Sequence, residues 1–252
     1  MSLCTVGPPQ GRREESGDLR LGDYRMSTVA SRCLNLFFDL DGTLSDPSEG
    51  ITRSVQYALE RLGRPIVPKS ELVRFIGPPL RWTFPRLLDT DDKDLVETAI
   101  RYYRERYEDV GLFENEVYRG IPELLRQLHD EDYPIYVVTA KPKVYADRII
   151  RHFGLDRCFI DVYGPELDGR FDEKRELVGF ILHQRRLGPR RTVMIGDRAS
   201  DIESGRAYGT RAIGVTYGFG TLEEITAAKP DHICHSPAEI ALAVRHLRES
   251  QP

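Results

Sequence analysis

The chain has 252 residues, of which 40% are hydrophobic and 9% aromatic, enough for a packed core in one or two domains. Its 36 Lys and Arg residues against 40 Asp and Glu give a net charge of −4. This balance excludes a global positive field of the kind that attracts nucleic acid or an anionic membrane. We therefore expect neither a nucleic-acid polymer nor a membrane as a partner.

The cysteine pattern and the hydropathy pattern both indicate a reducing, aqueous compartment. The four cysteines show no C-x-x-C pair and no spacing typical of a zinc site or a disulfide framework. No run of about 18 apolar residues is present, and the first 25 residues lack the apolar segment of a secretory signal. We expect a soluble, cytoplasmic protein, and the sequence leaves open whether it is a monomer or a homodimer.

The sequence pattern changes twice in the N-terminal half of the chain. Residues 1–30 are rich in Gly, Pro, Ser and charge without periodicity, which predicts a flexible leader. Cys33 to Phe38 is a short apolar run typical of a buried strand, and the Asp41-Gly42 turn signal follows it. From Asp46 to about Tyr118 the sequence is helical, with no convincing strand. Apolar stripes at helical spacing support this, namely Ile51, Val55, Ala58, Leu59 and Leu62, then Val96, Ile100, Tyr103 and Tyr107.

Beyond Gly120 strands and helices alternate. Strands are predicted at 135–138, 159–163, 192–195, 211–215 and 231–234, and helices at 122–129, after Pro142, at 174–184, 201–208 and from Pro237. Alternation of this kind predicts an α/β fold with a Rossmann-like parallel sheet and helices on both faces. We expect residues 31–45 and 119–252 to form this core domain, and residues 46–118 to be an inserted all-helical cap domain.

Polar side chains follow three of the predicted strands, at the point where ligands bind in open parallel sheets. The residues are Asp39 and Asp41, then Thr139 and Lys141, and then Asp197 and Asp201, with Lys174 opening a helix between them. Asp39 and Asp41 directly follow a buried apolar run, where an unpaired charge would cost several kcal/mol. The sequence therefore predicts that something holds these charges.

Taken singly, most of these residues also have ordinary structural interpretations. Asp197 after a glycine suits a turn, and Asp201 or Thr139 suits a helix cap. Lys174 lies beside two acidic residues and, like Lys141, is also typical of a solvated surface lysine. The functional interpretation rests on the whole set, since scattered surface charge has no reason to gather at strand ends.

At this point the sequence resembles the haloacid dehalogenase superfamily of phosphatases. FDLDGTL at 38–44 is similar to the first motif of that family, and VVTAKP at 137–142 to the second. Lys174 in FDEKRELV is similar to the third motif, and IGDRASD at 195–201 to the fourth. The four motifs occur in order and span nearly all the chain from Leu34 onward.

The resemblance implies a role for each motif residue. Asp39 would be the nucleophile that forms an aspartyl phosphate, and Asp41 the general acid and base. Lys174 would neutralise charge in the transition state. The implied cofactor is Mg²⁺, since an all-oxygen site with waters suits a hard cation. Its ligands would be Asp39, the backbone carbonyl of Asp41, Asp197 and, as a supporting residue, Asp201.

The resemblance also implies a substrate-binding set and a branch of the family. Phosphate would bind at Thr139, Ala140 and Lys141, with Arg81 and Trp82 of the cap as candidate substrate contacts. Asp41 favours phosphoryl transfer, because dehalogenases lack this second aspartate. The helical cap and its loop FIGPPLRWTF at 75–84 resemble phosphoglycolate phosphatases and related 5′-nucleotidase-like proteins. GVTYGFG at 214–220 is interpreted as a turn beyond a strand.

The sequence thus favours a Mg²⁺-dependent phosphatase acting on a small phosphorylated metabolite, a phosphoglycolate-like monoester. One alternative is a 5′-nucleotidase acting on nucleoside monophosphates. Another is a phosphomutase of the same fold, which would hand the phosphoryl group to a second sugar phosphate. A third alternative is a binding or regulatory protein without turnover. The intact motif residues argue against it.

Overall fold

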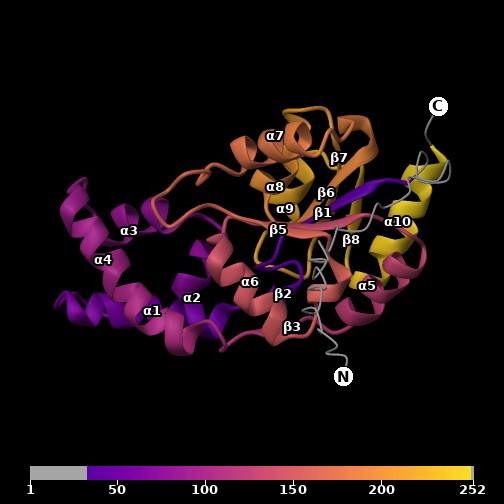
Figure 1. The fold of residues 1–252 in the computed structure, drawn as a ribbon. Coiled ribbons are helices and arrows are strands. Elements are labelled where there is room, and N and C mark those ends of the chain that lie inside the picture. The colour runs from indigo at the N-terminus through magenta and orange to yellow at the C-terminus, as the bar shows by residue number, and fades with distance from the viewer. Residues whose placement is uncertain (1–32, 251–252) are drawn as a thin grey trace, which may run out of the picture. The chain divides into compact units, whose positions relative to one another are not determined.

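A computed structural model describes residues 33–250 of the chain (Figure 1). The predicted leader, residues 1–30, lies outside the described residues. Within the described part, no helix is long and apolar enough to cross a lipid bilayer.

The core is a six-stranded, all-parallel sheet in the order β5-β4-β1-β6-β7-β8. Its strands are β1 (Asn35–Phe38), β4 (Ile135–Val138), β5 (Asp161–Tyr163), β6 (Thr192–Gly196), β7 (Arg211–Val215) and β8 (His232–Cys234). The chain builds outward from β1 in one direction and then returns to build on its other side. The predicted α/β fold is confirmed, and β1 lies at the switch point where such sheets bind ligands.

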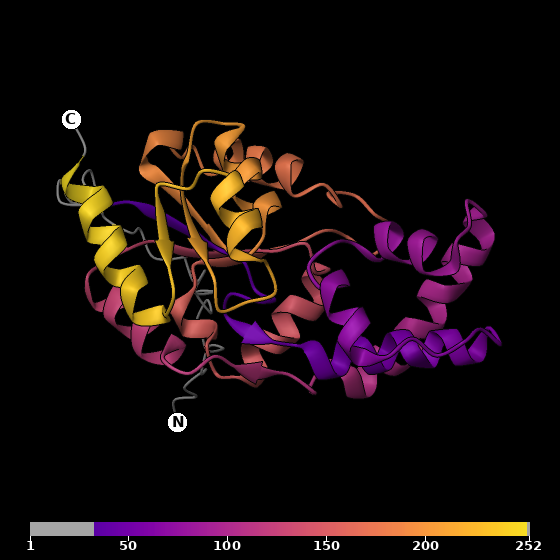
Figure 2. The ribbon, with the colours of Figure 1, turned by 180° about the vertical axis from the view of Figure 1, so that it is seen from behind.

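Helices cover both faces of this sheet (Figures 1 and 2). One face carries α5 (Ile121–Asp130), α6 (Lys143–His152) and α10 (Pro237–Glu249), and the other α7 (Lys174–Gln184), α8 (Ala199–Arg206) and α9 (Leu222–Ala227). Because side chains alternate along a strand, Leu36 and Phe38 pack into the larger core cluster and Phe37 into the cluster around α7. Each of these fully buried side chains contributes about 1.5–3 kcal/mol.

A helical insertion, defined here as residues 48–111, follows β1. It comprises α1 (Ser48–Arg61), α2 (Lys69–Leu72), the 3₁₀ turn η2 (Val73–Phe75), α3 (Leu80–Leu88), α4 (Lys93–Arg106) and the π-helical turn η3 (Tyr107–Gly111). Two 3₁₀ turns elsewhere are η4 (Asp156–Cys158) and η5 (Pro189–Arg191). The amphipathic helices α1 and α4 pack against each other through their apolar stripes, as the sequence periodicity predicts.

The prediction of no strand between residues 46 and 118 is wrong at the ends of that segment. The strand β2 (Ser45–Asp46) pairs antiparallel with β3 (Glu116–Val117). The two passages between sheet and insertion therefore run side by side. Two-residue strands are too short to leave a period-two hydrophobic pattern, which explains why the sequence did not reveal them.

The segment 75–84 is also not the loop that the sequence suggested. Gly77 to Pro79 is irregular, but α3 begins at Leu80, with Pro79 immediately before its first residue. A proline stops a helix that precedes it, yet it favours a helix that follows, because its fixed φ suits the first turn and its missing N–H is not needed there.

Candidate active site

The strand order brings the sequence-predicted polar residues together. β1 lies between β4 and β6, so the residues that follow these three strands meet at one edge of the sheet. Asp39 extends the ladder, since its backbone N–H donates to the Ile195 carbonyl at 2.9 Å. Thr139 follows β4 and Asp197 follows β6, and both are buried.

Lys174 is the first residue of α7, which covers one face of the sheet, and its side chain extends to the same sheet edge. Its Nζ donates to Asp39 Oδ1 at 2.7 Å and also to Asp201 Oδ1. Burial lowers the pKa of the Lys174 ammonium, but Asp201 and Asp39 more than offset this, so the net shift is upward. Lys174 is therefore a buried, permanently charged group in contact with two carboxylates, and the surface interpretation of this lysine is wrong.

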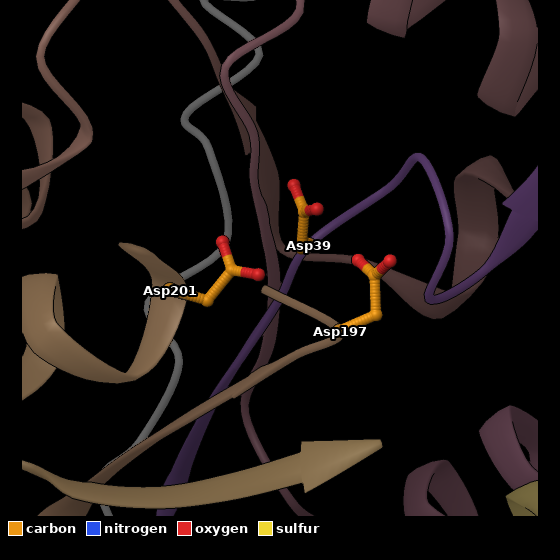
Figure 3. Close-up of side chains that lie close together, drawn as sticks. All are labelled: Asp39, Asp197 and Asp201. Atoms are coloured by element: carbon orange, nitrogen blue, oxygen red, sulfur yellow. The ribbon is translucent and has the colours of Figure 1, made fainter. Parts of the chain in front are cut away.

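Asp39, Asp197 and Asp201 form what we call the acidic cluster (Figure 3). One carboxylate oxygen from each lies within 4.8 Å of the others, and the three side chains face a common space (Figure 3). Burial, with Asp201 and Asp39 nearby, raises the pKa of Asp197 well above its ordinary value. Burial also raises the pKa of Asp201 to about 6, against the opposing effect of Lys174.

The surroundings of the Asp197 carboxylate indicate that this cluster suits a cation. Its side chain is fully buried, yet no lysine or arginine nitrogen of residues 33–250 lies within 4.0 Å of it. Its Oδ2 accepts from the Phe219 backbone N–H at 2.7 Å, and its Oδ1 from the Thr43 hydroxyl at 3.4 Å. An all-oxygen donor set with one uncompensated buried carboxylate fits a hard divalent ion such as Mg²⁺.

The glycine-rich segment 214–220, interpreted from sequence as a simple turn, encloses Asp197. A Cβ on Gly218 would lie 2.5 Å from the Asp197 Oδ2, and one on Gly220 only 1.8 Å from the Asp197 carbonyl oxygen. Gly42, at φ +87°, also lies against this carboxylate, since a Cβ on it would lie 2.2 Å from the Asp197 Oδ2. Sequence reasoning missed these contacts, although the density of glycines in this segment was a signal that backbone comes close to something.

Asp41 lies in a different setting from the acidic cluster. Its Oδ2 pairs with Lys141 Nζ at 2.9 Å, while its buried Oδ1 has no hydrogen-bond partner within residues 33–250. Burial raises the pKa of the Asp41 carboxyl, and the charge of Lys141 opposes that shift. Lys141 is itself buried and also donates to the hydroxyl of Tyr107, from the insertion, at 2.6 Å. The solvated interpretation of Lys141 is therefore wrong.

The segment after β4 makes a tight turn that leads into α6. The Thr139 hydroxyl accepts the backbone N–H of Lys141 at 3.1 Å, which folds the chain tightly around Ala140. Pro142 follows and precedes α6, and the first N–H of that helix, from Lys143, donates to the Pro165 carbonyl at 2.9 Å.

Two cavities adjoin at Gly77 to Pro79, between the sheet edge and the insertion. The larger, about 610 Å³, is lined by Asp39 and Lys174 from the core and by Trp82 and Arg86 from the insertion. The smaller, about 70 Å³, is lined by Asp41 and by apolar and aromatic side chains of the insertion. Asp39 thus faces a space of ligand size, whereas Asp41 faces the smaller cavity that adjoins it.

The two cap residues singled out from sequence have different surroundings. Arg81 lines both cavities, but its guanidinium is held by Glu97 at 2.7 Å and Asp172 at 3.4 Å. Trp82 is 43% exposed, with the Arg86 guanidinium 3.7 Å from its ring centre. Trp82 is therefore the more available of the two for contact with a ligand.

Known proteins match this chain over most of its length. A 5′-nucleotidase from Pseudomonas aeruginosa is 46% identical over 89% of this chain and 100% of the relative. A tyrosine-protein kinase, PtkA, from Mycobacterium tuberculosis is 34% identical over 85% of this chain and 71% of the relative. A phosphoglycolate phosphatase from Vibrio parahaemolyticus is 28% identical over 81% of this chain and 92% of the relative.

A solved structure and a family profile also match this chain over most of its length. The crystal structure of a predicted phosphatase from Clostridium acetobutylicum superposes with a TM-score of 0.81 at 36% identity, covering 85% of this chain and 99% of that one. The profile of the haloacid dehalogenase-like hydrolases matches residues 36–215, which include all four motifs. The resemblance seen in the sequence is thereby confirmed, and the chain belongs to the haloacid dehalogenase-like hydrolase family.

Proposed function

We propose that this hydrolase is a Mg²⁺-dependent phosphatase that cleaves small phosphate monoesters through an aspartyl phosphate on Asp39. The observation that carries the proposal is the arrangement around Asp39. One buried ammonium, Lys174, contacts it, and the uncompensated carboxylate of Asp197 lies within the same cluster. A dianionic phosphate beside Asp39 needs positive charge on both sides, and this arrangement provides a place for it.

In the first step, an Asp39 carboxylate oxygen attacks phosphorus. The new O–P bond forms as the ester P–O bond breaks, and the proton of the Asp41 carboxyl passes to the leaving alkoxide. Burial, which raises the pKa of Asp41, favours the protonated form that this step requires. The products are an alcohol, the aspartyl phosphate and an ionised Asp41.

In the second step, water attacks the phosphorus of the aspartyl phosphate. Asp41 takes a proton from that water, the bond between Asp39 and phosphorus breaks, and inorganic phosphate leaves. Asp39 is again a carboxylate and Asp41 again carries its proton, so the cycle is complete. Two easier displacements replace one difficult displacement.

The surrounding residues hold the phosphoryl group and its charge. Lys174, in contact with Asp39, would neutralise charge on the transferring group. The Thr139 hydroxyl and the backbone N–H groups after it would bind phosphate oxygens. The acidic cluster, with the backbone carbonyl of Asp41, would hold Mg²⁺. When bound, this ion would offset the phosphate charge and orient the group for in-line displacement.

For the substrate class, the larger cavity favours a nucleoside 5′-monophosphate over phosphoglycolate. Its volume of about 610 Å³ lies in the range of sites for drug-sized ligands, and phosphoglycolate would leave most of it empty. Trp82, an insertion residue that lines the same cavity as Asp39, offers a partly exposed aromatic surface of the kind on which bases stack. The Pseudomonas aeruginosa relative named as a 5′-nucleotidase supports the same choice.

The test is phosphate release from phosphoglycolate, nucleoside 5′-monophosphates and sugar phosphates, with Mg²⁺ or with a chelator. We expect release that depends on Mg²⁺ and is fastest with a nucleotide. A best rate with phosphoglycolate would overturn the substrate class but keep the mechanism. A long-lived phosphoenzyme that passes its phosphoryl group to a sugar phosphate or a tyrosine instead of water would replace the phosphatase by a phosphotransferase.

A further inference from the structure

We propose that Tyr107 is a positioning residue that couples the helical insertion to the proton donor Asp41, acting through Lys141. This inference rests on the proposed function, because it concerns the proton that Asp41 gives to the leaving group. It assigns to the insertion a part in the chemical step in addition to enclosing the substrate.

The three residues form a continuous chain of contacts from insertion to core. The Lys141 ammonium lies between an Asp41 Oδ2 at 2.9 Å and the Tyr107 hydroxyl oxygen at 2.6 Å. All three side chains are buried, with exposed fractions of 7% or less. An ammonium in such a place has few other partners, so the phenol oxygen fixes where the ammonium lies.

Tyr107 is itself held rigidly. Its ring stacks on Tyr103 with centroids 5.0 Å apart and meets Tyr145 edge-on at 5.6 Å. It begins the π-helical turn η3, where α4 ends, and such turns are frequent at functional sites. The hydroxyl is therefore presented to Lys141 by a packed aromatic cluster and follows the position of the insertion.

The pairing decides which oxygen of Asp41 remains available. With Lys141 on Oδ2, the buried Oδ1 is the oxygen without a partner in residues 33–250. That oxygen is free to carry the proton and pass it to the ester oxygen as the P–O bond breaks. Without the Tyr107 hydroxyl, the ammonium loses one of its two anchors and Asp41 loses its fixed orientation.

A positioning role for proton donation has a signature that a packing role lacks. Leaving groups that are strong bases, such as alkoxides, need the proton during bond cleavage, whereas 4-nitrophenolate leaves readily without it. Loss of the Tyr107 hydroxyl should therefore matter most for poor leaving groups. A general loosening of the insertion would slow all esters alike.

The experiment measures kcat and KM for the wild type, Tyr107→Phe and Tyr133→Phe on 4-nitrophenyl phosphate, phenyl phosphate and an alkyl phosphate. Tyr133 is a matched control, since it is also buried, its hydroxyl has no partner in the described part of the chain, and it lines neither cavity. For Tyr107→Phe we expect kcat/KM on the alkyl ester to fall about 10- to 100-fold, the size of a general-acid effect, with less than about a threefold change in kcat/KM on 4-nitrophenyl phosphate. The ratio kcat/KM reports only the steps through ester cleavage, so the later hydrolysis of the aspartyl phosphate, in which Asp41 acts as base for every ester, does not enter it.

A double-mutant cycle with Lys141→Met tests the route. If Tyr107 acts through Lys141, then Tyr107→Phe adds little to the loss that Lys141→Met already causes on the alkyl ester. Equal losses of kcat/KM on all esters, no loss on any, or additive effects of the two substitutions on kcat/KM would each overturn the inference while leaving the phosphatase intact. Absence of hydrolysis by the wild type would instead overturn the proposed function and the inference together. Thermal unfolding of each variant checks that it is folded.

Discussion

The two walls of the candidate site are held in different ways. On the core wall, Asp39, Asp197 and Lys174 are buried and fixed by ion pairs or by backbone contacts from strand ends and a helix start. On the insertion wall, Trp82 is 43% exposed, and its aromatic and cationic neighbours, Phe75 and Arg86, come from the same part of the insertion.

This difference separates chemistry from recognition. A carboxylate that must attack phosphorus tolerates little misplacement, and burial among fixed partners supplies that precision. A surface that selects the leaving group needs only complementary contact, and exposed side chains can adapt to it. Substitutions on the core wall should therefore change rate by large factors, and substitutions of exposed insertion residues such as Trp82 should change apparent affinity by small ones. The buried Tyr107, which contacts Lys141 of the core, belongs with the core wall in this respect.

The largest effect is expected from Asp39→Asn. An amide cannot serve as the nucleophile, so phosphate release should fall by at least about a thousandfold. Phosphate release under saturating Mg²⁺ measures this. Asp156→Asn, the same change at an exposed site in η4, is the matched control and should keep the wild-type rate. Full activity of the Asp39→Asn protein would contradict the mechanism.

Asp197→Asn should move activity and stability in opposite directions. Removing a ligand charge should lower Mg²⁺-dependent activity by about 100-fold or more. In chelator, the same change removes an uncompensated buried charge and should raise the free energy of unfolding by on the order of 1–3 kcal/mol. Phosphate release and urea unfolding with and without Mg²⁺ measure the two effects. A destabilised variant in chelator would show that the carboxylate is already compensated.

Stability in chelator should depend on pH through the acidic cluster. A carboxyl whose pKa is raised on folding, as Asp201 to about 6, stabilises the protein fully below its unfolded value near 3.8 and loses that contribution as pH rises through 6. The free energy of unfolding should thus fall between about pH 4.5 and 6.5, by on the order of 1–3 kcal/mol.

Urea unfolding at half-unit pH steps in chelator tests this expectation. Surface carboxyls with lowered pKa, such as Glu114 and Glu131, lose their stabilising contribution only at lower pH. The window therefore reports the carboxyls whose pKa burial raises, which are the acidic cluster together with Asp41 and Asp172. Saturating Mg²⁺ should flatten or reverse the slope, because the ion binds the ionised cluster. A slope unchanged by Mg²⁺ would place the ion elsewhere.

The smallest effect is expected from Trp82→Ala. Loss of a stacking surface should raise KM for a nucleoside 5′-monophosphate about 5- to 10-fold, with kcat within about twofold. Phosphoglycolate, which has no base, serves as the internal control, and Trp82→Phe should keep most of the affinity. Equal changes for both substrates would mean that Trp82 only packs the insertion.

The core half of the site was predictable because its geometry follows from topology. Once alternating strands indicate a parallel sheet, the residues that follow neighbouring strands must meet, and Asp39, Thr139 and Asp197 do. The family motifs singled out Lys174, at the start of a helix that the local pattern already predicted. Local pattern and family resemblance therefore agreed for most of the fold and for the acidic cluster.

The insertion half was not predictable, because its contacts depend on how far the helices lie from the sheet. Tyr107 falls on an apolar stripe, and a stripe at helical spacing predicts core packing but no hydrogen bond to Lys141. Arg81 stood out as a basic residue in a conspicuous segment, yet its partners Glu97 and Asp172 are distant in sequence. In each case tertiary distance, which periodicity does not encode, decides the role.

The paired strands β2 and β3 have a consequence for how such enzymes diversify. Because the chain leaves the sheet and returns to it through adjacent, hydrogen-bonded passages, the ends of the insertion are already joined to each other. An insertion anchored in this way can lengthen, shorten or be exchanged without disturbing the order of the sheet. The β2–β3 pair thus lets the insertion, and with it the range of substrates, change during evolution while the residues of the core keep the same reaction.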